Sequence, residues 1–133
     1  MTPELTALAL SALLLLVQLA IMAVRANLEI GPGYFLGPRD TPPPKALNAG
    51  TMRLKRAYEN HIEGLLPFAV AVAVVSLADA SSALTVAFAW GYLAARVLYV
   101  PAYFYGWVPW RSVFFGIGYL ATALMLIAAL LGG

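Results

Sequence analysis

Long hydrophobic runs alternate with short polar segments along this chain, and four of the runs are about as long as a membrane span. They cover about residues 5–26, 51–78, 83–104 and 111–131. A helix needs about 20 mainly apolar residues to cross the hydrocarbon core of a bilayer. Open strands cannot span that core, because their backbone groups would stay unpaired. The pattern predicts an all-α integral membrane four-helix bundle, formed by the single domain 1–133.

The connections between the predicted spans differ in length and composition. Residues 31–50 form the only long connection and contain Gly-Pro-Gly and Pro-Pro-Pro, which resist helix formation and favour turns or extended chain. Residues 79–82 form a tight turn, with Ser81 or Ser82 placed to cap the following helix. The second and third spans should therefore form a hairpin.

Composition supports the membrane class and narrows the partners. The chain is 62% hydrophobic and 11% charged, and its mean hydropathy is +0.84, well above that of soluble domains. The net charge of +2 is too small to favour nucleic acid as a partner. The sequence has no cysteine and one histidine, so no metal site is expected.

Lysine and arginine are concentrated around the first and third connections. Six lie in or beside the first connection, at Arg25, Arg39, Lys45, Arg53, Lys55 and Arg56, and Arg111 ends the third. Short loops rich in these residues stay on the cytoplasmic side. We therefore expect both termini on the non-cytoplasmic side, in a bacterial inner membrane.

A polar stripe marks the start of the second span. At about 100° per residue, Arg53, Arg56, Asn60 and Glu63 fall on one face of a helix. Polar side chains on a membrane helix usually have a partner, so this stripe is a candidate binding site. The arginines could instead be anchors on lipid head groups.

A second stripe follows on the third span, where Tyr92, Arg96, Tyr99 and Tyr103 share a face. An arginine well inside an apolar span costs a few kcal/mol on insertion scales, so it should have an anionic partner or a wet cavity. Glu63 is the partner we expect for Arg96.

Other polar and aromatic residues have simpler interpretations. His61 is expected to be a hydrogen-bonded residue at the membrane interface rather than a metal ligand. Lys55 stands four residues before Glu59, a spacing that predicts a solvated ion pair. An aromatic belt is the leading interpretation for Tyr103, Tyr105, Trp107 and Trp110.

The first stripe belongs to a longer motif. Residues 53–68 contain R-x-x-R-A-x-x-N-x-x-E followed by Pro-Phe. This motif resembles the second-helix signature of the MAPEG family, the membrane-associated proteins in eicosanoid and glutathione metabolism. The chain length, the four spans and the long first connection are similar as well, so the resemblance covers essentially the whole chain.

The resemblance implies a homotrimer that binds glutathione as cosubstrate between subunits, near the cytoplasmic face. It implies a glutathione-binding role for Arg25, Arg53, Arg56, Asn60, Glu63, Arg96, Tyr99 and Tyr103. Arg111, followed by Ser112, is similar to the family's arginine that acts on the thiol, and is the candidate catalytic residue. Gly64 departs from the leukotriene C synthase branch, which has a tyrosine at this position and one more glutathione contact.

The chemistry of glutathione fits these residues. Its carboxylates match the fork of an arginine side chain, and its ammonium matches Glu63. Arg111 would stabilise the thiolate electrostatically, because an arginine does not lose its proton at neutral pH. The leading function is a glutathione-dependent transferase or peroxidase acting on lipophilic small molecules that enter from membrane lipid. The alternative is a non-catalytic lipid- or ligand-binding scaffold of the same fold.

Overall fold

The computed structural model describes residues 1–132, which form helices and connecting segments. The helices are α1 (Pro3–Ile30), α2 (Pro32–Leu36), α3 (Ala49–Leu77), α4 (Ala83–Phe104) and α5 (Trp110–Gly132). Four of them, all except α2, are long and apolar enough to cross a membrane. The predicted all-α architecture with four spans is confirmed, and the observed helix ends lie within a few residues of the predicted ones.

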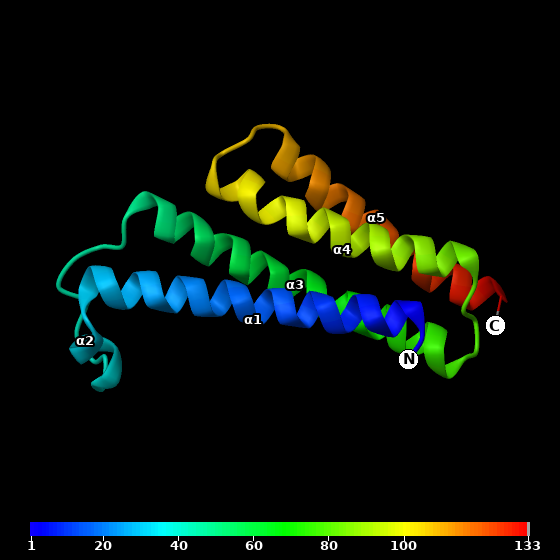
Figure 1. Ribbon diagram of the computed structural model, residues 1–133, viewed down its shortest axis with the longest axis horizontal. Coiled ribbons are helices and arrows are strands. Elements are labelled where there is room, and N and C mark those ends of the chain that lie inside the picture. Colours follow the sequence, from blue (N-terminus) through cyan, green and yellow to red (C-terminus); the bar gives the residue numbers. More distant parts are fainter. Residues whose placement is uncertain (133) are drawn as a thin grey trace.

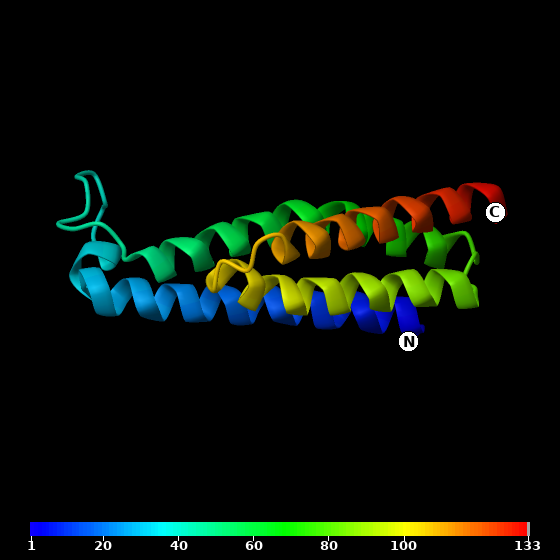
Figure 2. The same cartoon turned by 90° about the horizontal axis from the view of Figure 1, so that it is seen from above.

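The four long helices run side by side, with α1 and α4 in one layer and α3 and α5 in the other (Figures 1 and 2). Helices α1 and α5 lie at opposite corners and make no contact, whereas α3 packs against all three other long helices. Both termini lie at the end where α3 turns into α4, and the other two connections lie toward the opposite end (Figure 1). There, α1 and α3 extend past the turn between α4 and α5 (Figure 1).

The first connection contains one element that the sequence prediction missed. We expected only turns and extended chain between residues 31 and 50, but Pro32–Leu36 form the short helix α2. Proline is well tolerated in the first turn of a helix, where its missing N–H group has no partner to lose. Gly31 ends α1 with a φ of 111°, a conformation open to glycine, and so lets α2 start in a new direction.

Side-chain caps mark the starts of three of the long helices, α1, α3 and α4. Thr2 accepts from the backbone N–H of Leu5, and Asn48 accepts from that of Thr51. Ser82 and Thr85 form a reciprocal capping box at the start of α4, which confirms the predicted cap. The sharp turn between α3 and α4 therefore follows directly from local sequence.

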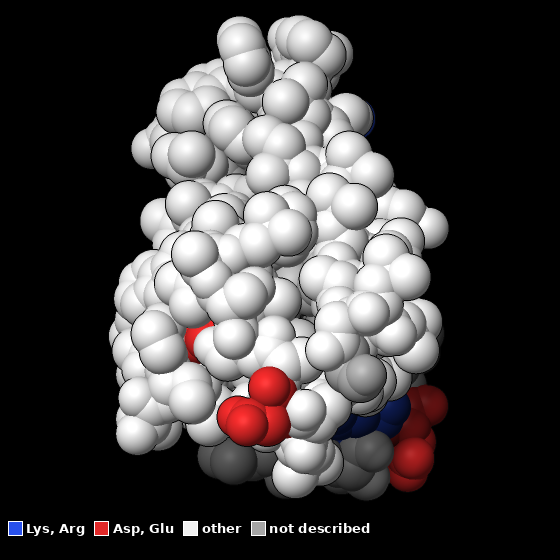
Figure 3. All heavy atoms as spheres, turned by 90° about the vertical axis from the view of Figure 1, so that its right-hand side faces the viewer, with Lys and Arg blue, Asp and Glu red and all other residues white. Residues whose placement is uncertain are grey.

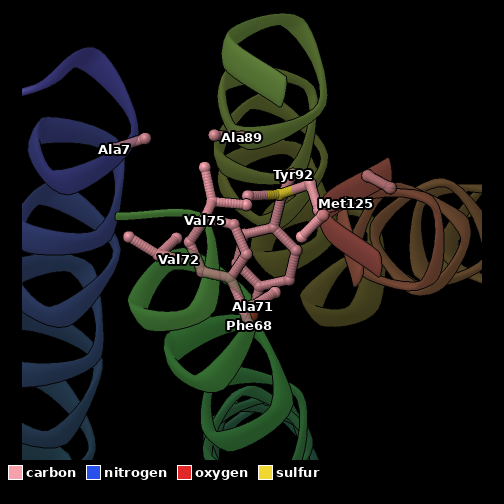
Figure 4. Close-up of a cluster of buried hydrophobic side chains, with 10 residues drawn as sticks. Ala7, Phe68, Ala71, Val72, Val75, Ala89, Tyr92 and Met125 are labelled. Atoms are coloured by element: carbon pink, nitrogen blue, oxygen red, sulfur yellow. The ribbon is translucent and has the colours of Figure 1, made fainter. Parts of the chain in front are cut away.

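Small and aromatic side chains form the core near the terminal end of the bundle (Figure 4). The ring of Phe68 on α3 stacks on that of Tyr92 on α4, with 3.8 Å between centroids and an interplanar angle of 11°. Met125 of α5 packs beside them, and Ala7 of α1 and Ala89 of α4 allow close helix approach (Figure 4). This cluster joins all four spans.

The outer surface is mainly apolar, as a lipid environment requires. Large hydrophobic side chains are exposed on each long helix, including Leu13, Leu66, Leu98 and Leu120. Figure 3, which views the end that holds the termini, shows mostly uncharged atoms and only small charged areas. These exposed side chains would be costly in water but not in a bilayer.

Several buried polar groups are paired across helices. His61 of α3 is fully buried and donates from Nδ1 to Gln18 Oε1 of α1, so it is hydrogen-bonded as predicted and points into the bundle. Glu4 of α1 accepts a 3.1 Å hydrogen bond from Thr85 of α4. Such pairs fix the register of α1 against its neighbours, because a shift would leave polar groups unpaired in the bundle.

Arg25 anchors the loop end of α1 to α3 and α4. Its Nε donates to Thr51 Oγ1 at 3.1 Å, and its guanidinium lies 5.4 Å from the ring centre of Phe104. Glu29 completes the contact by accepting from the Thr51 hydroxyl and from the Asn48 backbone N–H. Gly50 fits beneath, because a Cβ there would lie 3.1 Å from both Arg25 Nη2 and Phe104.

Replacing Gly50 with alanine should therefore destabilise the fold. The added methyl group must displace the Phe104 ring, and overpacking of this kind costs about 1–3 kcal/mol. We expect a lower thermal unfolding midpoint in detergent. Gly91→Ala is the matched control, because Gly91 is also helical but has open space around it, so alanine should leave the midpoint unchanged or raise it. Equal midpoints for the two variants would contradict this packing account.

Candidate functional site

Arg96 lies at the centre of the polar residues that α3 and α4 bring together. Its side chain is 3% exposed, and its Nη1 donates to Asn60 Oδ1 at 2.9 Å. The guanidinium carbon lies over the Tyr99 ring, 4.6 Å from the ring centre. The two predicted stripes therefore meet, because α3 and α4 face each other along this length.

The expected ion pair between Arg96 and Glu63 is not present, so that prediction is wrong for the single chain. Asn60 stands one helical turn before Glu63 and takes its place. Glu63 is exposed, with its side chain at the opening of a cavity. Among residues 1–132, the ion pair formed is Lys55 with Glu59 at 3.8 Å, as the sequence predicted.

Two arginines pack on one aromatic ring at the loop end of the bundle. The Arg56 guanidinium of α3 lies 5.9 Å from the ring centre of Tyr103, and that of Arg111 on α5 lies 5.1 Å from it. Tyr103 also contacts Tyr99 one turn earlier, at 5.6 Å between centroids. The ring thus holds two cations of like charge near each other, an arrangement that favours binding of an anion.

A cavity of about 280 Å³ opens beside these residues. Its lining comes from three helices and consists of Asn60, Tyr99, Tyr103, Arg111, Ser112 and Phe115. Five of these six are polar or carry a hydroxyl group, so the cavity presents hydrogen-bond donors together with the Arg111 charge. It is the more polar of two adjoining spaces.

The second space is a larger cleft of about 430 Å³ between α3, α4 and α5. Asn60 and Phe115 line both spaces, so the two lie next to each other. Polar groups in the cleft come from Glu63, Tyr92, Arg96 and Thr122, and the remaining lining is mainly apolar, with Pro67, Tyr119, Ala123 and Leu126. The pair of spaces can hold one polar and one apolar molecule, or one molecule with both characters.

Three of the predicted site residues line neither space, namely Arg25, Arg53 and Arg56, and Arg56 lies beside the smaller one only through the Tyr103 ring. Arg25 is occupied by Thr51 and Phe104, as described above, and lines neither cavity. Arg53 donates from Nη1 to the carbonyl oxygen of Phe104 at 3.2 Å, so it caps the final turn of α4. In the single chain, Arg25 and Arg53 support the loop end of the bundle rather than line a cavity.

The contribution of α5 beyond Arg111 and Ser112 was not predicted. Gly118 and Thr122 line the cleft one turn apart, and the Thr122 hydroxyl donates to the Gly118 carbonyl oxygen at 2.9 Å. In the sequence, the apolar residues of α5 that line the cleft cannot be distinguished from residues that face lipid. The one available signal was Gly-Ile-Gly at residues 116–118, since small residues on a span often mark close helix contact.

In the described part of the chain, no three side chains among His, Cys, Asp and Glu lie close enough together to hold a metal ion. The aromatic residues Tyr105, Trp107 and Trp110 are exposed around the turn between α4 and α5, and their role in an aromatic belt stays a prediction. Tyr103 differs, because two arginines lie against its ring in addition to Tyr99.

Comparison with known proteins identifies the family. The sequence profile of the MAPEG family matches residues 4–131, nearly the whole chain. No curated protein and no solved structure matches it. The four membrane-spanning helices agree with the four-helix bundle of this family. The chain therefore belongs to the MAPEG family, the membrane-associated proteins in eicosanoid and glutathione metabolism.

Proposed function

We propose that this protein is a glutathione-dependent membrane transferase or peroxidase that acts on small lipophilic electrophiles or hydroperoxides. The family includes glutathione-dependent transferases and peroxidases as well as other members. The observation that carries the proposal is the placement of Arg56 and Arg111 on the Tyr103 ring, beside a polar cavity. Two cations held together beside a cavity fit a ligand with more than one negative charge, as glutathione has.

The site offers a partner for each charged group of glutathione. Arg56 and Arg96 supply forks for its carboxylates, and Asn60 supplies an amide between them. Glu63, exposed at the cleft, can accept from the ammonium group. A tripeptide held at these points would occupy the polar cavity and the neighbouring part of the cleft.

Arg111 is the proposed catalytic residue. A guanidinium near the sulfur stabilises the thiolate, which is the nucleophile, relative to the thiol. Arg111 acts through its charge and not as a base, since it stays protonated at neutral pH. The thiolate then attacks an electrophile supplied from the apolar side of the site and displaces its leaving group. With a hydroperoxide it attacks the terminal oxygen, so that the O–O bond breaks to give the sulfenic acid of glutathione and an alkoxide that takes up a proton.

Assembly and orientation are part of the same proposal. Polar groups on α3 and α4 are only partly satisfied within one chain, which favours a homotrimer with glutathione bound between subunits. In such an assembly Arg25 and Arg53 can also contact the ligand, as the family resemblance implies. The arginine-rich loop end would face the cytoplasm and both termini the other side of a bacterial inner membrane.

The alternative is a non-catalytic scaffold that binds a lipid or another ligand. The larger, mainly apolar cleft is consistent with this function, because it needs no reacting sulfur. The two functions differ in their need for Arg111: binding requires the carboxylate-reading arginines, whereas chemistry also requires a cation at the sulfur.

The assembly is tested by the mass of the purified protein in mild detergent. Multi-angle light scattering, corrected for bound detergent, should give three times the chain mass of 14.2 kDa. A monomeric mass across several mild detergents would contradict the proposed trimer.

Glutathione binding is tested by calorimetric titration of the wild type, Glu63→Gln and Glu59→Gln. The change at Glu63 removes the charge facing the ammonium and should weaken binding roughly tenfold or more, because hydrogen bonds to charged groups contribute about 1.5–3 kcal/mol. Glu59 is equally exposed on α3 but pairs with Lys55, so its change should leave the affinity unaltered. Equal affinities in all three proteins would rule out the assignment of Glu63.

The chemistry is tested at Arg111. Bound glutathione should show the ultraviolet absorbance of a thiolate at a pH where free glutathione does not, and Arg111→Ala should lose this signal and the conjugation of an aryl halide while keeping most of the affinity. Arg111→Lys keeps a charge with a narrower donor geometry and should keep partial activity. Wild-type protein that binds glutathione without thiolate absorbance or turnover would instead be the scaffold.

A further inference from the structure

The hydroxyl group of Tyr92 is buried in the bundle without a hydrogen-bond partner. The side chain is 2% exposed, and its ring is fixed by stacking on Phe68. Nearly all buried polar groups in native proteins are paired, and an unpaired hydroxyl costs about 1–3 kcal/mol. A phenylalanine would make the same stack without this cost, so packing alone does not explain the tyrosine.

One edge of Arg96 is unpaired in the same way. Nη1 is bonded to Asn60, but the N–H groups of Nε and Nη2 have no partner and are buried. These two atoms form the side of the guanidinium on which two N–H groups run parallel, the geometry that receives both oxygens of a carboxylate. The Tyr99 ring lies 4.6 Å from the guanidinium carbon and supplies no hydrogen-bond partner to Nε or Nη2.

Tyr92 and Arg96 both line the larger cleft, one helical turn apart on α4. Glycines keep that part of the cleft open: a Cβ at Gly64 would lie 3.4 Å from the Tyr92 hydroxyl and 3.9 Å from Arg96 Nη1. On the α5 side, a Cβ at Gly118 would lie 3.5 Å from the Tyr92 ring and 3.9 Å from Arg96 Cδ. Both glycines therefore adjoin the same two side chains.

The unpaired groups are all donors, and one of them carries a positive charge. A phenolic O–H and two guanidinium N–H groups are best satisfied by an acceptor with two oxygens and a negative charge. A carboxylate meets these requirements. Water would satisfy single donors but would leave the charge of Arg96 without a counter-ion in a low-dielectric environment.

We propose that Tyr92 is a ligand-contacting residue, whose hydroxyl joins the Nε–Nη2 edge of Arg96 to hold one carboxylate of glutathione in the cleft. The inference rests on the proposed function for the identity of the ligand. The proposal adds one hydroxyl group to the residues that determine specificity. The ring of Tyr92 has a structural role in the core, whereas its hydroxyl group has none.

Tyr92→Phe tests this inference through two measurements, the thermal stability of the ligand-free protein, which should not fall, and the affinity for glutathione, which should. The change removes an unsatisfied buried group, so the thermal midpoint without ligand should stay the same or rise. The dissociation constant for glutathione should increase about tenfold, as expected for loss of one hydrogen bond to a charged group. Tyr105→Phe is the control: Tyr105 is 63% exposed and lines neither space, so both readouts should match the wild type.

Each other outcome overturns the inference in a distinguishable way. If the wild type binds glutathione and Tyr92→Phe binds it equally well, the hydroxyl contacts no ligand, and the proposed function stands alone. If Tyr92→Phe lowers the midpoint of the ligand-free protein, the hydroxyl is bonded to a neighbouring subunit. If the wild type does not bind glutathione at all, the proposed function fails, and this inference fails with it.

Gly64→Ala provides a second test that does not alter Tyr92. Its methyl group would make an ordinary contact with the hydroxyl, so the fold should be retained while the approach to the hydroxyl is covered. We expect weaker glutathione binding at an unchanged trimer mass. Should Tyr92→Phe fail to assemble, undiminished binding by Gly64→Ala would overturn the inference by itself.

Discussion

The arrangement of the polar groups depends on one constraint, the guanidinium of Arg96 buried within a membrane span. A charge there costs several kcal/mol unless its surroundings compensate. Asn60 supplies an acceptor from the opposite helix, and the Tyr99 ring supplies a negative face. Neither neutralises the charge, so the centre of the site remains cationic. Because α3 must present Asn60 to Arg96, Glu63 one turn later lies at the opening of the larger cleft, and Arg56 one turn earlier lies against the Tyr103 ring.

Small residues make this arrangement possible. Alanines at the contacts between α1, α3 and α4, and glycines facing Tyr92 and Arg96, let the helices approach while large polar side chains fit between them. The core that fixes the helices lies toward the termini and the polar cavity toward the arginine-rich end, whereas the larger cleft runs alongside part of the core. Tyr92 and Leu126 therefore take part both in the core and in the lining of the larger cleft.

The four spans could be predicted because hydropathy over about 20 residues leaves few alternatives in a membrane protein. The meeting of two polar stripes was also accessible, since helical periodicity assigns a face to each residue. The sequence did not predict that Asn60, rather than Glu63, would bind Arg96. That pairing depends on the axial offset between α3 and α4, which no pattern within one helix encodes. The residues of α5 that line the cleft could not be predicted either, because an apolar residue that faces a cavity has the same sequence pattern as one that faces lipid. Arg25 and Arg53 show the reverse, because their charge suggested ligand contacts while Thr51 and Phe104 engage them.

The unequal lengths of the helices have a consequence for how molecules reach the site. Helices α1 and α3 contain 28 and 29 residues, and α4 and α5 contain 22 and 23. At about 1.5 Å per residue, the longer pair exceeds the shorter pair in length by about 9 Å, and at the loop end α1 and α3 extend past the turn between α4 and α5 (Figure 1). In the proposed membrane orientation, this step would place the polar cavity near the head groups and the larger cleft deeper, beside the acyl chains. A water-soluble molecule can then arrive along the membrane normal and a lipid-dissolved one sideways, so that neither has to leave its own solvent.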